Sequence, residues 1–421
     1  MAHAPGTGRR SRTLSPVRPT RSSDPGRDAW PSYSAYAVQG YVIYGLGAIT
    51  PYLRTQLGLS DAQVGLHPTG MALGIVFAGA FAAGLDRRFG EVAVRGAAIG
   101  GLAVAIGAIA VAPAFAVTLG AAVVLGLGLG TMLGYANAIL ARPGGRLARV
   151  RVARANLWAM AAAFVCPLVL SLAAFAGLPW ALGLAPTLLL LVVVGLDLRA
   201  GPRLERSPAA ARSDGRLPRG YWLAWTFLVA AVAVEFSIVF WGATLIGRRT
   251  GVDTAAATLL GGMFVGGMFV GRLAQSLGLG THGGVRRPAA IGLALAIVGA
   301  SVAWASTAPV LSGAGLFVAG LGVAGLYPLG VAAALGAAPG QLAHAGTRLT
   351  LASGMAILAA PLALGVIADS SGVVVGWALV VGLAIVALVL AAALPESAPT
   401  DGEAAGFDDA GSVGPVVLGP G

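Results

Sequence analysis

The stretch LVAAVAVEFSIVFWGA contains one ionisable side chain, the carboxylate of Glu235 near its middle. A charge at the centre of a membrane helix costs roughly 2.5–3.5 kcal/mol, and protonating a glutamate at pH 7 costs about 3.7 kcal/mol. Because the two costs are similar, both forms are accessible. We expect Glu235 to face a central cavity, where it carries a proton or contacts a cationic group of a bound molecule. The alternative is a structural hydrogen bond between helices.

Further polar or aromatic side chains fall within predicted apolar helices and are candidates to line the same cavity. Individually, each is as well explained by a helix–helix contact or an interfacial position. These candidates are Gln39, Tyr44, Asn137, Trp241 and Tyr327.

The elements that position these residues are predicted to be transmembrane helices. The 421 residues are 57% hydrophobic and only 10% charged, against about 25% charged in ordinary soluble domains. Apolar runs of about 20 residues recur, and each is long enough to cross a bilayer as a helix. We therefore predict an all-α polytopic membrane protein with twelve spans. They begin near Tyr33, Val64, Val92, Phe115, Val152, Pro179 (with Pro186 inside the helix), Tyr221, Ala256, Arg287, Val310, Thr347 and Val373.

The arginines predict the orientation of these spans. All 27 basic residues are arginine, and 24 of them fall in segments that lie on one side if both termini are cytoplasmic. Positive charge is enriched in cytoplasmic loops. The net charge of +11 is thus explained by topology, and we expect no nucleic-acid partner.

The sequence contains few residues suited to catalysis or to metal binding. The four histidines are scattered without metal-ligand spacing, and Cys166 is the single cysteine. We expect neither a metal nor a cofactor, and a polytopic membrane enzyme is the less favoured class because Glu235 has no histidine nearby.

A polar, arginine-rich segment divides the apolar chain into two halves. We predict six-helix bundles over residues 30–199 and 219–394, joined by a cytoplasmic linker at 200–218. Residues 1–29 and 395–421 have the composition of disordered cytoplasmic tails.

Similar motifs recur in the two halves. Asp86 follows the second predicted helix in AAGLDRRFG, and Gln275 follows the eighth, 189 residues later, in GRLAQSLG. Pro167 and Pro361 occupy the fifth and eleventh helices, 194 residues apart. Matching offsets at independent sites are typical of a duplicated unit.

Twelve spans, a central linker and these loop motifs resemble the major facilitator superfamily of secondary transporters. The family's loop after helix 2 reads roughly G-x-L-x-D-R-x-G-R, whereas GLDRRFG has one extra residue before its final glycine and the second copy has Gln275 in the aspartate position. The resemblance implies two pseudo-symmetric six-helix bundles that move a small solute by alternating access, with the site near mid-membrane.

The resemblance also implies a cytoplasmic gate. Its residues would be Asp86, Arg87, Arg348, Gln275 and Arg272. We expect Asp86 to engage the start of the eleventh helix and Arg348 when the protein opens outward, since a helix N-terminus favours a carboxylate. The alternative is that Asp86 balances neighbouring arginines in a solvated loop.

The glycine-rich string GGMFVGGMFVG spans residues 261–271 in the eighth helix. Its spacing of four places small residues on one helix face, which favours either close packing or a sliding contact between helices.

The predicted substrate is a small organic molecule that is neutral or weakly basic, because no arginine is placed deep within a span, apart from Arg54 and Arg348 near helix ends, and anions require fixed positive charge. We expect a proton-coupled, multi-pass monomer in a bacterial cytoplasmic membrane. A non-transporting sensor or scaffold of similar architecture is the alternative.

Overall fold

The computed structural model describes residues 29–142, 144–196, 216–278 and 284–394, and in these ranges every regular element is a helix. The predicted tails and most of the predicted linker lie outside the described residues, so the predicted domain boundaries stay a prediction.

Twelve helical segments cross the described part of the molecule. Ten are long and apolar enough to span a membrane, and two more complete the set: the 28-residue α1 and the shorter apolar segment Trp180–Leu196. The first half contains α1 (Trp30–Leu57), α2 (Asp61–Phe89), α3 (Glu91–Val111), α4 (Phe115–Ala141), α5 (Gly145–Phe175), the 3₁₀ helix η2 (Trp180–Leu184) and α6 (Ala185–Leu196).

The second half contains six spans, three of which are each built from two consecutive helices. Its elements are α7 (Arg219–Thr250), α8 (Thr254–Gly261), α9 (Met263–Ser276), α10 (Arg286–Ala305), α11 (Pro309–Val323), α12 (Leu326–Gly336), the 3₁₀ helix η3 (Pro339–Gln341), α13 (Leu342–Ser371), α14 (Val373–Gly376) and α15 (Ala378–Ala393).

The observed starts differ from the predicted ones mainly at two helices. α5 begins seven residues before Val152 and α13 begins five residues before Thr347, because their first turns are polar and an apolar run marks only the part inside the bilayer. The sixth span, Trp180–Leu196, contains Pro186 as predicted, in the first turn of α6 after the 3₁₀ helix η2.

Burial distinguishes central helices from peripheral ones. In the most apolar 18-residue stretch of α7, 72% of the residues are buried. In the corresponding stretches of α3, α10 and the span that ends with α15, 33% are buried. Exposed side chains on the peripheral helices are apolar, as at Val104 and Val389. A surface of this kind is suited to contact with lipid.

The two halves pack internally in the same way. A Cβ on Gly126 of α4 would lie 2.0 Å from the Met71 carbonyl oxygen of α2, and one on Gly320 of α11 would lie 2.0 Å from the Phe264 carbonyl oxygen of α9. These glycines are 194 residues apart, the same offset as the two helix prolines. Two pseudo-symmetric six-helix bundles, as predicted, are therefore confirmed.

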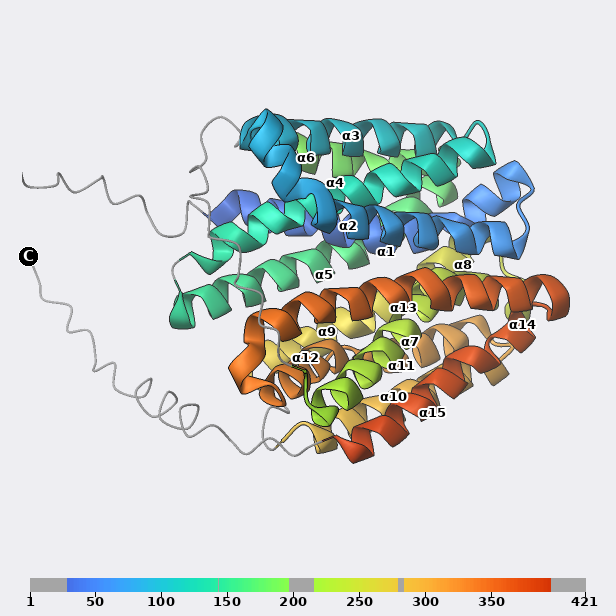
Figure 1. Cartoon of the computed structure of the whole chain (residues 1–421). Helices are drawn as coiled ribbons and strands as arrows, with labels where there is room; N and C mark the ends of the chain where they lie inside the picture. Colours follow the sequence, from blue (N-terminus) through green and yellow to red (C-terminus); the bar gives the residue numbers. More distant parts are fainter. Residues whose placement is uncertain (1–28, 143, 197–215, 279–283, 395–421) are drawn as a thin grey trace, which may run out of the picture.

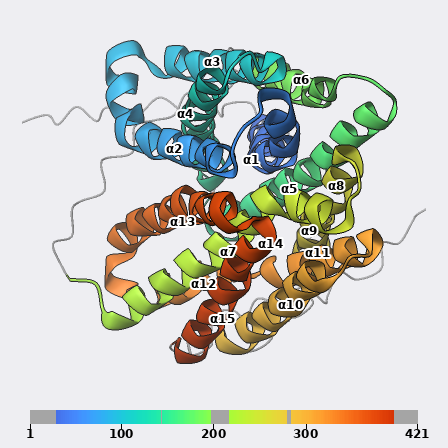
Figure 2. The same cartoon turned by 90° about the vertical axis from the view of Figure 1, so that its right-hand side faces the viewer.

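Contact between the halves is made by α1, α2 and α5 on one side and by α7, α8, α9 and α13 on the other, as Figures 1 and 2 show. The interactions across the halves that bear on function are Tyr44 with Glu235, Gly47 with Val239, Thr50 with Phe240, Thr69 with Leu358, and Asp369 with the start of α2.

All of these interactions lie at the middle of the helices or toward the end that carries the α1–α2 and α13–α14 turns, on the right in Figure 1. We call this the closed end. The opposite end, where α1 and α7 begin, we call the terminal end. The described structure therefore holds the halves together on one side of Glu235.

Candidate functional site

Glu235 lies at the centre of the molecule and at the junction of the two halves. It is the seventeenth of the 32 residues of α7 and is 5% exposed. The Tyr44 hydroxyl, from the middle of α1, donates a hydrogen bond of 2.6 Å to its Oε1. One carboxylate thus joins the first helix of one half to the first helix of the other.

Aromatic rings pack beside this pair. Tyr44 stacks on Phe236 with ring centroids 6.0 Å apart, and Phe236 stacks on Phe240 at 6.3 Å. An apolar wall of this kind lowers the local dielectric, and it strengthens electrostatic interactions at Glu235 relative to water.

Arg272 of α9, one of the predicted gate residues, is partly buried. Its Nε is buried and has no hydrogen-bond partner among the described residues. Arg272 lies four residues from the end of α9, so it is not placed deep within a span.

A second polar cluster lies toward the terminal end. The Tyr36 hydroxyl of α1 donates a hydrogen bond to Oδ1 of Asn137 on α4. Asn137 and Tyr327 are exposed and Gln39 is partly buried. These three predicted cavity residues therefore lie on accessible surface, while their role in binding stays a prediction.

Trp241 has a different environment. Its side chain is fully buried, and the indole Nε1 donates a hydrogen bond of 3.0 Å to the Pro361 carbonyl of α13. In this conformation its indole is hydrogen-bonded to α13 of its own half, and its role in binding stays a prediction.

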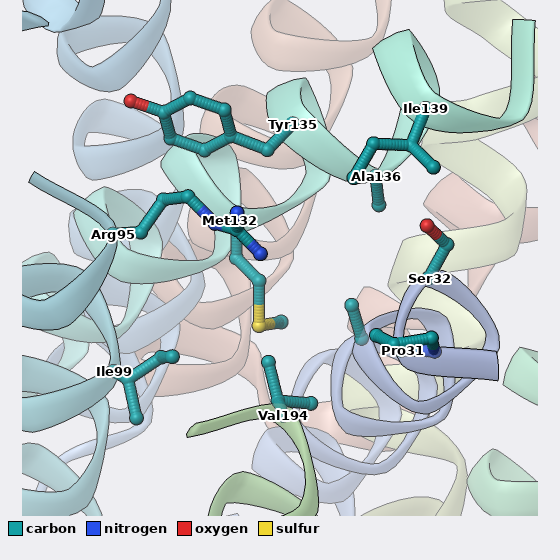
Figure 3. Close-up of a pocket in the computed structure, with 10 residues that line it drawn as sticks. Pro31, Ser32, Arg95, Ile99, Met132, Tyr135, Ala136, Ile139 and Val194 are labelled. Atoms are coloured by element: carbon teal, nitrogen blue, oxygen red, sulfur yellow. The ribbon is translucent and has the colours of Figure 1, made fainter. Parts of the chain in front are cut away.

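The predicted gate residues of the first half contact their own bundle. Asp86 accepts a hydrogen bond from the Tyr135 hydroxyl of α4, and the Arg95 guanidinium lies 5.5 Å from the Tyr135 ring centroid. Arg95 and Tyr135 line a small pocket between α1, α3, α4 and α6 (Figure 3). Arg87 is exposed.

The gate residues of the second half behave in the same way. Gln275 lies against Gly325, where an added Cβ would be 2.6 Å from its Nε2, and the Arg348 guanidinium covers the ring of Trp222 at 5.4 Å. The structure does not bring Asp86 and Arg348 together. Since the expected contact belongs to a state open at the other end, it stays a prediction.

The sequence analysis missed a group of residues that joins the halves at the closed end. The carboxylate of Asp369, near the end of α13, accepts hydrogen bonds from the Asp61 amide (2.6 Å), the Ala62 amide (3.0 Å) and the Ser60 hydroxyl (3.0 Å). We call these four residues the closed-end latch. Arg54 of α1 adds an ion pair to Asp61 at 3.1 Å.

The local sequence explains why the start of α2 can bind the carboxylate of Asp369. Ser60 and Gln63 form a capping box at the start of α2, a pattern that fixes a helix N-terminus. The remaining free amides of the first turn then bind a carboxylate from outside. The string SDAQ and a carboxylate at the end of the eleventh span were both visible in the sequence, but nothing local links them.

Among the described side chains, no group of three or more histidine, cysteine or acidic residues is arranged to hold a metal ion.

Comparison with solved structures identifies the fold. Over 88–90% of this chain, similar structures include a bacterial homologue of the human lysosomal transporter Spinster in an inward-facing, occupied conformation (14% identity, 100% of that chain, TM-score 0.65) and the nucleoside transporter NupG (15%, 98%, 0.66). The xylose transporter XylE from E. coli, in a partially occluded inward-open conformation, is also similar (12% identity, 89% of this chain and 98% of that chain, TM-score 0.67).

No family model matches the sequence, and no curated protein is similar to it in sequence. The structural similarity shows that the chain has the fold of major facilitator superfamily transporters. Its ten long apolar helices, with this fold, make it a multi-pass membrane protein.

Proposed function

We propose that this protein is a secondary transporter of the major facilitator superfamily that moves a small organic solute by alternating access, coupled to protons through Glu235. The observation that carries the proposal is the Tyr44–Glu235 hydrogen bond of 2.6 Å between the first helices of the two halves. A titratable group at this junction links protonation to the relative position of the halves.

The physical basis is the low polarity of the site. A charged glutamate between apolar bundles is stable only while water or a cation accompanies it. Protonation removes that requirement, so the halves can close around a neutral side chain. A membrane potential supplies about 2.3 kcal/mol per charge per 100 mV, enough to bias such a cycle.

The proposed orientation places both termini in the cytoplasm, as the arginine distribution favours, and makes the closed end the outer one. The structure then corresponds to an inward-facing state. We further propose that the protein acts as a monomer in a bacterial cytoplasmic membrane, that it is not an enzyme, and that its solute carries no net negative charge, because Glu235 is central.

The test is transport by the full-length protein in proteoliposomes with an imposed pH gradient, measured over a panel of neutral and amine-containing metabolites. For the wild type we expect the gradient to accelerate flux of at least one compound. For Glu235→Gln we expect flux that no longer responds to the gradient, while exchange of solute across the membrane persists.

Tyr44→Phe is the matched variant, because it removes the hydrogen bond but keeps the titratable carboxylate; we expect flux that is slower but still responds to the gradient. Unchanged pH dependence in Glu235→Gln would contradict proton coupling through this residue. Absence of any gradient-dependent flux by the wild type across the panel would contradict the transport function.

A further inference from the structure

A pocket at the closed end lies across the boundary between the two halves. Its volume is about 490 Å³, within the range of sites that bind small molecules. One wall comes from residues 51–59, at the end of α1 and in the turn after it, and the other from residues 243–257 of α7 and α8. Glu235 and the predicted cavity residues are not among those that line it, so this pocket is separate from the proposed solute site.

Two arginines, one from each half, line this pocket. They are Arg54 and Arg248, each in the last turn of its helix, and no acidic residue belongs to the lining. A cleft lined by charge of one sign and by low-dielectric walls concentrates ions of the opposite sign. We propose that the pocket binds a small dianion, whose two negative charges are carried by carboxylate or phosphate oxygens.

The two arginines occupy equivalent positions in the two halves, and this favours a ligand with two charges. Arg54 and Arg248 are 194 residues apart, the same offset as Pro167 and Pro361. The halves of this fold are related by a pseudo-twofold axis along the membrane normal, so a ligand between the halves meets the same guanidinium from each side. A dianion can pair with both arginines at once, whereas a monoanion leaves one positive charge without a partner.

The side chain of Arg248 is available to a ligand. It is exposed and forms no hydrogen bond or ion pair with another described residue. The next residue, Arg249, differs in both respects: it does not line the pocket, and its guanidinium donates a hydrogen bond of 2.8 Å to the Ala305 carbonyl. The two neighbouring arginines therefore separate the effect of the pocket from that of positive charge in general.

Arg54 has donors to spare, although it already has a partner. Its Nη1 pairs with Asp61 at 3.1 Å and its Nε donates a long hydrogen bond of 3.4 Å to the Leu59 carbonyl. A guanidinium has five N–H donors, so Arg54 can keep these contacts and also bind a ligand oxygen. The carboxylate of Asp253, which adjoins the lining, accepts the Ala256 amide hydrogen bond that caps α8.

A bound dianion would stabilise the closed end. Without a ligand, Arg54 and Arg248 place like charges on opposite halves, and their repulsion favours separation of the halves. A dianion between them attracts both arginines, so it binds most tightly when this end is closed and stabilises that state. With the proposed orientation the pocket opens to the outer side, where an external dianion would act as a regulator distinct from the transported solute.

The first test measures binding to the purified full-length protein in detergent, by thermal unfolding followed through tryptophan fluorescence at constant ionic strength. The probes are succinate, inorganic phosphate and, as the monoanion, acetate. We expect the melting temperature to rise to a plateau with succinate, with phosphate or with both; the effective probe identifies the anionic group. A rise without a plateau is typical of ions that are merely excluded from the protein surface. That result, no rise, or an equal rise with acetate would overturn the inference.

Arg248→Gln is the decisive variant, because its side chain makes no hydrogen bond or ion pair that the substitution could break. We expect the affinity to fall about five- to tenfold, since a charge-assisted hydrogen bond at an exposed site is partly screened. Arg249→Gln is the matched control, which removes the same charge outside the pocket and should leave the affinity unchanged. Equal losses in the two variants, or no loss in Arg248→Gln, would overturn the inference.

The second test measures the effect of the ligand on the closed end. Spin labels are placed on cysteines at Ala114 and Thr307, which are exposed in turns of opposite halves and lie outside the pocket; the native Cys166 is replaced by alanine. At ten times the dissociation constant, we expect the ratio of the short-distance to the long-distance population to rise about tenfold. An unchanged ratio would overturn the regulatory role. Gradient-driven transport by a protein that binds no dianion would overturn this inference and leave the proposed function intact.

Discussion

The closed-end latch makes a quantitative prediction about which conformation the protein prefers. Asp369 is exposed and accepts hydrogen bonds from two α2 amides and a serine hydroxyl of the other half. Asparagine at this position keeps the size and one acceptor but loses the charge, so Asp369→Asn should weaken the contact between the halves at this end only.

The magnitude follows from the interactions that are lost. A carboxylate at a helix N-terminus contributes about 0.3–1 kcal/mol when exposed, and each hydrogen bond to a charged group contributes about 1.5–3 kcal/mol before solvent screening. Because Asp369 is exposed, we discount the sum to about 1–2 kcal/mol. A difference of this size changes the ratio of two states by roughly 5–30-fold.

The assay is a distance distribution between spin labels on cysteines introduced at Thr55 of α1 and Ser370 of α13, which are exposed residues near the closed end in opposite halves. The native Cys166 is fully buried and is replaced by alanine. We expect Asp369→Asn to increase the ratio of the long-distance to the short-distance population by the factor given above.

Asp253→Asn is the matched control. Asp253 caps α8 by accepting a hydrogen bond of 2.8 Å from the Ala256 amide, so it has the same chemistry within one half. A distance distribution unchanged by Asp369→Asn, or shifted as much by Asp253→Asn, would refute the assignment of Asp369 as the residue that holds this end closed.

The remaining predictions concern the other end and the glycine faces. Asp86→Arg should impair transport in proteoliposomes, and adding Arg348→Asp should restore part of it; no loss and no rescue would contradict a contact between these residues in the other state. Gly267→Ala places its Cβ 2.0 Å from a carbonyl oxygen of α11 and should lower the melting temperature, since overpacking costs about 1–3 kcal/mol. Gly266→Ala places its Cβ 2.8 Å from a ring of α5 in the other half. It should therefore increase the population with the longer spin-label distance and lower the melting temperature less than Gly267→Ala does. Equal effects of the two variants on both measurements would contradict the assignment of one glycine to packing within a half and the other to the boundary between the halves.

These two glycines also show how far the sequence could be interpreted. The string GGMFVGGMFVG predicted a small-residue face without deciding between packing and sliding. In the structure Gly267 and Gly271 face α11 of the same half, while Gly262 and Gly266 face α5 of the other half. The same string therefore provides a packing face and a face at the boundary between the halves, and only the positions of the neighbouring helices distinguish them.

The sequence by itself determined the class of protein, the number of spans, the duplication and the central position of Glu235. Each of these follows from properties that lie along the chain: lipid requires long apolar runs whose backbone hydrogen bonds are internal, and a duplicated unit repeats its motifs at a fixed offset.

Only the tertiary structure decided which side chains meet. Tyr44 and Glu235 are 191 residues apart, and Asp369 meets an amide 308 residues away. Such contacts depend on how each helix is rotated about its axis and where it crosses its neighbours, which is set by packing between helices and leaves no periodic signal in the sequence.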